Sequence, residues 1–314
     1  MQIVAGTKEF QIERPTVVAI GKFDGRHKGH QMLLQKMLAM REEKGYRTLV
    51  FTFDMAPAGV VFGKGQTMIT TNQERRANME KMGIDYLVEY PFDQEAAHMA
   101  PEVFVAEILV GRLKAKAIVA GTDCGFGYRR AGDAKLLQKL APLYGYQAVI
   151  LEKQQDDSHR DISSTYIREK LDQGDMQKAN GLLGEPYAIH GKVVHGRHMG
   201  TPLLGFPTAN ILPPPEKYLP RFGVYVSRVL VDGAYYGGVS NIGRKPTITG
   251  ENPVGVETFI LGLDEDLYGK DIQVQLLDFE RPEQKFSGIE ELKARIEQDR
   301  QYAVEYFRQH PQWR

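Results

Sequence analysis

The chain has 314 residues, enough at roughly 150 residues per domain for about two domains with hydrophobic cores of their own. Its 40 Lys and Arg residues balance 40 Asp and Glu residues, which argues against a protein held on nucleic acid or on a membrane by bulk charge. The single cysteine, Cys124, excludes an intrachain disulfide and fits a reducing compartment, so we expect a cytoplasmic protein. No run approaches the ~18 apolar residues of a membrane span, and the first residues lack a signal-peptide pattern.

The first half of the chain alternates apolar, β-branched runs with amphipathic segments, a pattern typical of strands that alternate with helices. Strands are predicted at 16–21, 48–53, 85–92, 116–121 and 146–152. Helices are predicted at 30–45, 72–83, 102–113 and 132–145, followed by two short ones at 163–174 and 175–184. A Thr71-x-x-Glu74 capping box marks the second helix. This order predicts a Rossmann-like α/β domain whose parallel sheet binds ligands beyond the carboxyl ends of its strands.

From about residue 186 the pattern changes to short alternating strands separated by Gly, Pro and Asp-Gly. The dipeptide Asp232-Gly233 predicts a hairpin, and residues 256–263 and 271–279 are expected to pair with each other. A closed or nearly closed antiparallel β-barrel fits this spacing. A Ser287-x-x-Glu290 capping box predicts a terminal helix that covers one side of the barrel. We therefore expect two domains, residues 1–185 and 186–314.

A glycine-rich segment, GKFDGRHKGHQ, follows the first strand and ends in a helix. Its glycines allow a tight backbone, and His27 and His30 stand three residues apart at the helix start. Free amides at a helix N-terminus favour phosphate, and imidazoles donate to oxygens that gain charge as a phosphoanhydride breaks. Seen alone, so short a motif is more often a turn with two surface histidines. Its place between a strand and a helix of a parallel sheet favours the phosphate site.

A second polar element, ISSTYIR, begins a later helix. Ser163, Ser164 and Thr165 would serve equally as a helix N-cap, the commonest use of such hydroxyls. Arg168, one turn further along, is expected to face the same edge of the sheet.

Together these two elements resemble the HxGH and ISSTxxR signatures of the nucleotidylyltransferase superfamily. The longer Gly-x-Phe-Asp-Gly-x-His form resembles the FAD synthetase module of bacterial bifunctional riboflavin kinase/FAD synthetases. The resemblance implies catalytic roles for His27, His30 and Arg168. It implies ligand-binding roles for Gly21, Phe23, Asp24, Gly25, Gly29, Asp123, Ser163, Ser164 and Thr165.

The second half carries GRHMGTPLLGFPTANI, a glycine-rich stretch that on its own is as often a simple turn. Its Gly-Phe-Pro-Thr-Ala-Asn resembles the PTAN signature of riboflavin kinases, and NIGRKPT, VETFILGLDEDLYGK and FERPEQKF follow in the family's order. The resemblance covers about 15–185 and 186–305. It implies that Thr208 and Asn210 hold magnesium. Further ligand-binding residues implied are Gly196, Gly200, Gly205, Pro207, Asn241 and Arg281.

Phosphorylation of an alcohol needs a group that accepts the hydroxyl proton, and Glu257 holds the position of the general base in the matching family. A single strand glutamate is otherwise most often a surface residue. The resemblance thus implies two Mg²⁺-dependent steps. The C-terminal barrel converts riboflavin and ATP to FMN and ADP, and the N-terminal domain joins FMN to AMP, giving FAD and pyrophosphate.

The sequence departs from the family pattern mainly in the adenylylating half. Ala56 stands where the family usually has histidine, and Cys124 replaces an aromatic residue that would help to wall the flavin site. Glu185 replaces arginine at the domain junction, and Pro202 stands near a usual arginine of the kinase pattern. The kinase signature is otherwise intact, so the sequence supports the kinase more strongly than the synthetase.

Three other interpretations remain open: a riboflavin kinase with a degenerate nucleotidyltransferase domain, a transferase for another phosphorylated metabolite, and a flavin-sensing regulator that binds RNA. Zero net charge weighs against the regulator, since domains that bind nucleic acid usually show a basic excess. The expected partners are therefore flavins and ATP, with no membrane and no nucleic acid. We expect a monomer or a weak homo-oligomer.

Overall fold

The computed structural model describes residues 1–54, 67–194, 208–244 and 254–313. The chain divides into two compact units, Met1–Ser164 and Thr165–Arg314, each described here by itself. The predicted domain boundary after residue 185 stays a prediction. Within the described ranges, no helix is long and apolar enough to cross a membrane.

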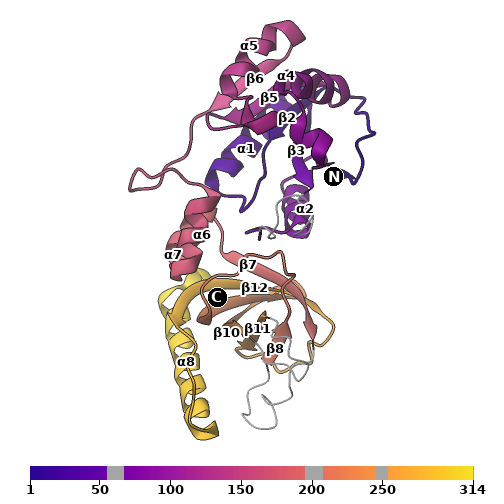
Figure 1. Ribbon diagram of the computed structural model, residues 1–314. Helices are drawn as coiled ribbons and strands as arrows, with labels where there is room; N and C mark the ends of the chain where they lie inside the picture. Colours follow the sequence, from indigo (N-terminus) through magenta and orange to yellow (C-terminus); the bar gives the residue numbers. More distant parts are fainter. Residues whose placement is uncertain (55–66, 195–207, 245–253, 314) are drawn as a thin grey trace. The chain divides into compact units, whose positions relative to one another are not determined.

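The N-terminal unit is built on a six-stranded sheet in the order β1-β4-β3-β2-β5-β6, and every pair of neighbouring strands is parallel (Figure 1). The strands are β1 (Gln2–Ala5), β2 (Thr16–Ile20), β3 (Arg47–Asp54), β4 (Tyr86–Pro91), β5 (Ala115–Gly121) and β6 (Gln147–Leu151). All five predicted strands are confirmed. The sixth, β1, was not predicted because it is a four-residue edge strand with mostly exposed side chains, which leaves no buried run to detect.

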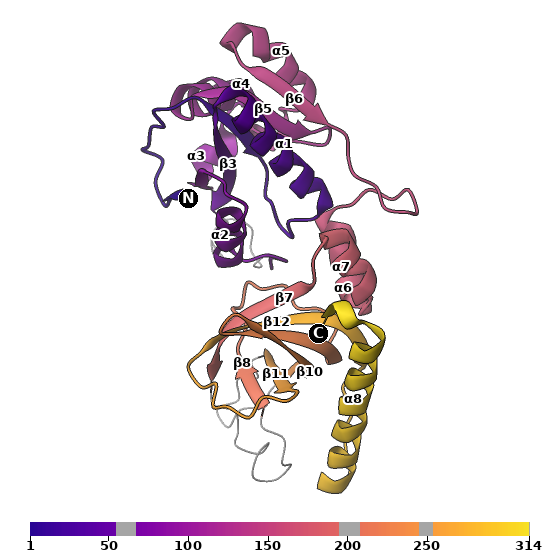
Figure 2. The same cartoon turned by 180° about the vertical axis from the view of Figure 1, so that it is seen from behind.

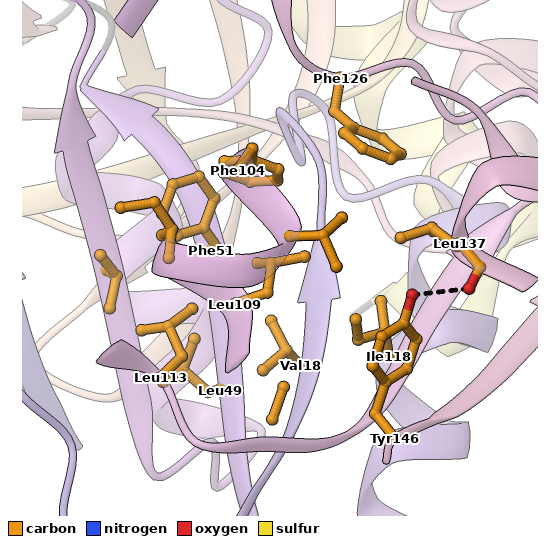
Figure 3. Packing of buried hydrophobic residues seen from close by; sticks show 14 of the residues in the cluster. Val18, Leu49, Phe51, Phe104, Leu109, Leu113, Ile118, Phe126, Leu137 and Tyr146 are labelled. Atoms are coloured by element: carbon orange, nitrogen blue, oxygen red, sulfur yellow. Dashed lines mark hydrogen bonds between the residues drawn. The ribbon is translucent and has the colours of Figure 1, made fainter. Parts of the chain in front are cut away.

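Helices cover both faces of this sheet, as predicted. They are α1 (Lys28–Lys44), α2 (Asn72–Lys81), α3 (Gln94–His98), α4 (Pro101–Val103) with the π-helix η1 (Phe104–Arg112), the 3-10 turn η2 (Tyr128–Arg130) and α5 (Ala134–Tyr144). Successive strand residues point to opposite faces, so Val17 packs with α1 and Val18 packs with η1 and α5. Figure 3 shows the hydrophobic cluster around Val18, in which the Tyr146 hydroxyl donates a hydrogen bond to the Leu137 carbonyl at 2.6 Å.

The predicted capping box at the start of α2 is confirmed. The Thr71 hydroxyl accepts a hydrogen bond from the Glu74 amide at 3.2 Å, and the Glu74 carboxylate accepts one from the Thr71 amide at 2.9 Å. These two hydrogen bonds satisfy amides that lack a partner inside the helix. They define where α2 begins, after the carboxyl end of β3.

The C-terminal unit is a closed barrel in the order β10-β11-β8-β7-β12-β9. Its strands are β7 (Tyr187–Val194), β8 (Thr208–Ile211), β9 (Gly223–Val231), β10 (Ala234–Arg244), β11 (Val254–Ile260) and β12 (Asp271–Arg281). Two short helices precede them, α6 (Ser164–Gln173) and α7 (Met176–Leu183). Closure pairs the edges that an open sheet of this kind would expose.

The predicted hairpin between β9 and β10 is confirmed, with φ of 48° at Asp232 and 85° at Gly233, the positive values of a two-residue turn. The predicted pairing of the next two strands is wrong. β11 pairs with β10 and β8, whereas β12 pairs with β7 and β9. Residues 261–270 separate β11 from β12, a connection far longer than the two-residue loop of a tight hairpin, and barrel closure gives each strand other neighbours.

The terminal helix α8 (Ile289–Gln309) lies along one side of the barrel and is followed by the short turn η4 (Pro311–Trp313) (Figures 1 and 2). The Phe307 ring of α8 lies so close to Gly237 on β10 that a Cβ atom added to Gly237 would be 2.6 Å from the ring. The predicted capping box is wrong, because the helix begins one residue after Gly288 and the Ser287 hydroxyl and amide bond to Glu291 instead, at 2.7 and 2.8 Å.

Candidate active sites

The first candidate site lies where β2 runs into α1, at the carboxyl edge of the parallel sheet. His27 is the N-cap residue of α1, and a Cβ added to Gly29 would lie 3.2 Å from the His27 ring. Glycine at this position therefore gives the imidazole room beside the first helical turn. Gly25 has φ of +80°, a conformation that glycine adopts at little cost.

The two histidine rings are stacked, with centroids 3.8 Å apart and planes inclined by 21°. Phe23 is fully buried and its ring lies 5.0 Å from that of His30. Burial lowers the pKa of His27 to about 4, against a smaller opposing effect of the Asp123 charge. Burial, followed by the nearby His27, lowers the pKa of His30 well below its ordinary value. Both imidazoles are therefore neutral at pH 7.

Neither buried Nδ1 atom of this pair has a hydrogen-bond partner among the residues that the structure describes. A buried polar atom without a partner is uncommon and costs stability. A neutral imidazole has one N–H donor and one acceptor, so each ring can donate to a phosphate oxygen. The pair thus has hydrogen-bonding capacity that the protein itself does not use.

Other elements hold the loop before α1 in place. The Asp24 side chain is buried and accepts a hydrogen bond from the Thr70 amide at 3.1 Å. The Ser164 hydroxyl donates to the Asp24 carbonyl at 2.7 Å. The second predicted signature therefore meets the first through Ser164, at the first residue of α6.

The remaining predicted residues of this site lie in different surroundings. Asp123, after β5, is exposed and lies 3.5 Å from the ammonium of Lys153, which follows β6. Arg168 belongs to the C-terminal unit, where its guanidinium stands 5.4 Å above the ring of Tyr218. Its predicted catalytic role stays a prediction.

A buried ion-pair network beside the loop was missed by the sequence analysis. Glu89 on β4 is fully buried and binds the guanidinium of Arg75 at 2.8 Å and that of Arg76 at 2.9 Å. Arg75 also reaches the Lys22 carbonyl, at 3.5 Å. One signal was available, because Glu89 is a charged residue inside an apolar strand, and buried carboxylates need paired cations.

The second candidate site lies on the wall of the barrel. Asn210 on β8 and Asn241 on β10 are both direct cross-strand partners of Glu257 on β11. Directly opposed residues of antiparallel strands point to the same face, so these three side chains form one row. The Thr208 hydroxyl donates to the Glu257 carboxylate at 2.9 Å. The structure therefore brings together four residues that the sequence analysis singled out separately.

Arg281, predicted to contact flavin, is held in an ion pair. Its guanidinium donates twice to Asp299 on α8, at 3.0 and 2.6 Å, and once to the Pro282 carbonyl at 3.2 Å. Arg295 joins the same cluster through Glu280 at 2.9 Å. Burial and the Asp299 charge raise the pKa of Glu280 to about 7. In this structure Arg281 fastens α8 to the end of β12, and its flavin contact stays a prediction.

Several predicted residues lie outside the described ranges. These are Ala56, Gly196, Gly200, Pro202, Gly205 and Pro207.

Comparison with known families assigns one family to each half of the chain. The family model for FAD synthetase matches residues 9–166, and that for riboflavin kinase matches residues 183–307. These spans contain the first and second candidate sites, respectively.

Curated relatives cover nearly the whole chain. A bifunctional riboflavin kinase/FMN adenylyltransferase of Escherichia coli strain K12 is 36% identical over 293 residues, 93% of this chain and 92% of its own. Proteins of the same name from Listeria monocytogenes and Bacillus subtilis are 34% and 35% identical with the same shares of each chain. A crystal structure described as a macrolide-efflux protein from Streptococcus pneumoniae is similar, with a TM-score of 0.84, 28% identity and coverage of 96% of this chain and 98% of that one.

Because burial disfavours the imidazolium, we expect His27 and His30 to remain neutral as the pH falls from about 8 to 5, whereas an unperturbed histidine gains a proton near 6.5. The unfolded chain binds these protons first, so the contribution of His27 to stability falls as the pH drops from about 6.5 toward 4, and that of His30 falls in the same direction. NMR titration of the imidazole protons, assigned with His27→Gln and His30→Gln, measures both values. A midpoint near 6.5 for either ring would contradict the buried, stacked geometry.

Proposed function

Because the chain belongs to the family of bifunctional riboflavin kinase/FMN adenylyltransferases, we propose that each unit carries one of two consecutive reactions. The barrel phosphorylates riboflavin with ATP, and the N-terminal unit transfers AMP from a second ATP to FMN. The observation that carries this proposal is that each unit holds a polar constellation of its own, the histidine pair in one and the Glu257 row in the other.

In the kinase reaction Glu257 is the general base. Its carboxylate accepts the proton of the ribityl hydroxyl while that oxygen attacks the γ-phosphorus of ATP, and ADP leaves. The hydrogen bond from Thr208 fixes the orientation of the carboxylate. Because Asn210 and Asn241 flank Glu257 on the same face, substrate oxygens can be held on either side of it.

The donor set around Glu257 fits Mg²⁺. Thr208 and Asn210 offer hydroxyl and amide oxygens, and no group of three or more His, Cys, Asp or Glu side chains forms a metal-binding set in the part of the chain that the structure describes. Mg²⁺ prefers oxygen ligands and usually takes only one or two from protein, with substrate phosphates and water completing its shell. When bound, the ion would neutralise charge on the phosphates.

In the adenylyltransferase reaction an FMN phosphate oxygen attacks the α-phosphorus of ATP, forming the new P–O bond of FAD as the bond to pyrophosphate breaks. This nucleophile is already ionised at pH 7, so the reaction needs positioning and charge stabilisation rather than a base. The neutral rings of His27 and His30 donate hydrogen bonds to the phosphate oxygens. The helix N-terminus of α1, just after His27, favours the same negative charge.

The departure at Cys124 is compatible with this reaction. The side chain is half-buried against the core cluster beside β5, and burial together with the Asp123 charge raises the pKa of its thiol to about 11. It is therefore an uncharged, mostly apolar filler in the place of the family's aromatic residue. The hydrogen-bonding capacity of His27 and His30 that the described residues leave unused supports an active transferase rather than a degenerate one.

We infer further that the protein works in the cytoplasm as a monomer or weak homo-oligomer, with flavins and ATP as its partners and no nucleic acid. Its single cysteine fits a reducing compartment.

Glu257→Gln keeps the shape of the side chain but removes its ability to accept a proton, so FMN formation should fall by about 10²–10⁴-fold while riboflavin still binds. Chromatography of the flavin products and riboflavin fluorescence measure the two properties. Glu265→Gln, which removes an exposed carboxylate elsewhere on the same unit, is the matched control and should be unaffected. Turnover at the wild-type rate in Glu257→Gln would refute the assignment of the base.

His30→Ala should lower FAD formation by about 10²–10³-fold, because a hydrogen-bond donor to the reacting phosphates is lost. FMN formation in the same sample should stay unchanged, since the kinase site lies in the other unit. His98→Ala, on an exposed histidine of α3, is the control. Loss of both activities would instead indicate that His30 is needed for folding.

A further inference from the structure

The turn that follows β5 holds two consecutive arginines in an unfavourable backbone conformation. Arg129 has φ of 51° and ψ of 28°, and Arg130 has φ of 60°. Residues with a Cβ rarely adopt this left-handed region, and such strain persists only where the surrounding structure imposes it. Strained residues of this kind are often found at ligand sites.

The surrounding contacts explain how the strain is maintained. The Tyr128 amide donates to the Met99 carbonyl at 2.7 Å. The backbones of Phe126 and Gly132 exchange hydrogen bonds of 3.0 and 2.9 Å across the base of the turn. A Cβ on Gly132 would lie 2.4 Å from the Phe126 ring, so the turn closes tightly on a buried aromatic residue. The turn is therefore a fixed element.

This conformation places the Arg130 guanidinium against Gly125. A Cβ on Gly125 would lie 2.6 Å from Nε and 2.8 Å from Nη2 of Arg130. The guanidinium also donates through Nη2 to the Asp123 carbonyl at 3.3 Å. Because Gly125 has no side chain, the guanidinium can lie directly over the backbone of the loop that starts at the carboxyl edge of β5.

The charge of Arg130 is not balanced by a nearby carboxylate. Within the described ranges no ion pair involves Arg130, and the carboxylate of Asp123 faces Lys153 instead. β5 lies directly beside β2 in the parallel sheet, so the loop after β5 starts next to the loop that carries the histidine pair. An exposed guanidinium, held over the loop backbone, therefore stands at the same sheet edge as two neutral imidazoles.

We propose that Arg130 is a further substrate-binding residue of the adenylyltransferase site and that it binds a phosphate group. This inference rests on the proposed function of the N-terminal unit. A guanidinium presents several N–H donors in a planar fork that matches the oxygens of phosphate. Both FMN and ATP carry such a group, and the experiment distinguishes the two sources.

The test compares steady-state FAD formation in wild type, Arg130→Met and Arg130→Lys. Arg129→Met is the matched control, because Arg129 shares the turn and the left-handed backbone but lies over the ring of Tyr128, at 5.1 Å. Gly125→Ala is a second, independent variant: the backbone of Gly125 is not left-handed, so alanine fits it, but the new methyl group displaces the guanidinium. FMN formation by the barrel reports the amount of active protein in every sample.

We expect Arg130→Met and Gly125→Ala to raise a KM at least about tenfold, with Arg130→Lys intermediate and Arg129→Met close to wild type. A rise confined to the KM for FMN identifies the FMN phosphate as the ligand. A rise confined to the KM values for ATP and, in the reverse reaction, pyrophosphate identifies the nucleotide phosphates. Either result supports the proposal.

Equal KM values for Arg130→Met and Arg129→Met would overturn the proposal while leaving the proposed function intact. A wild-type protein that makes FMN but no FAD would overturn both. Should Arg130→Met melt at a lower temperature than wild type, Gly125→Ala decides the matter, since it retains the arginine and changes only where its guanidinium lies.

Discussion

The packing of the His27 ring beside Gly29, where an added Cβ would lie 3.2 Å from the ring, is the contact on which the N-terminal site depends. The two imidazoles are stacked at the start of α1, and desolvation of the rings lowers the pKa of both and keeps them neutral. Neutral rings can donate to phosphate without also forming strong ion pairs with carboxylates of the protein. The anchoring of Asp24 by Thr70 and Ser164 then fixes the loop that carries the pair.

The barrel site depends on cross-strand register instead. Asn210, Glu257 and Asn241 come from three strands, and only their exact opposition in the ladder brings their side chains into one row. A shift of one residue in β11 would turn Glu257 to the other face and replace it with an apolar or hydroxyl side chain. The closed barrel and the α8 helix, fastened through Arg281 and Asp299, hold that register in place.

Sequence patterns predicted the helices and strands better than they predicted which strands pair with each other. Apolar, β-branched runs and capping signals found five of the six strands of the parallel sheet and most helices, because burial on one or both faces leaves a local trace. Pairing of β11 with β8 and β10 leaves no such trace, and neither does the short edge strand β1. Likewise, motif spacing pointed to His27 and His30, and the family resemblance pointed to Glu257. The Arg75 and Glu89 ion pair and the position of Arg130 over Gly125 depend instead on contacts between distant segments or on backbone conformation.

Incubation of the protein with Mg²⁺, ATP and either riboflavin or FMN, followed by chromatography of the flavins with fluorescence detection, shows directly whether one chain carries two active sites. We expect FMN from riboflavin, and FAD with pyrophosphate from FMN. FMN without FAD would contradict the transferase half. Failure to form FMN from riboflavin would contradict the barrel site.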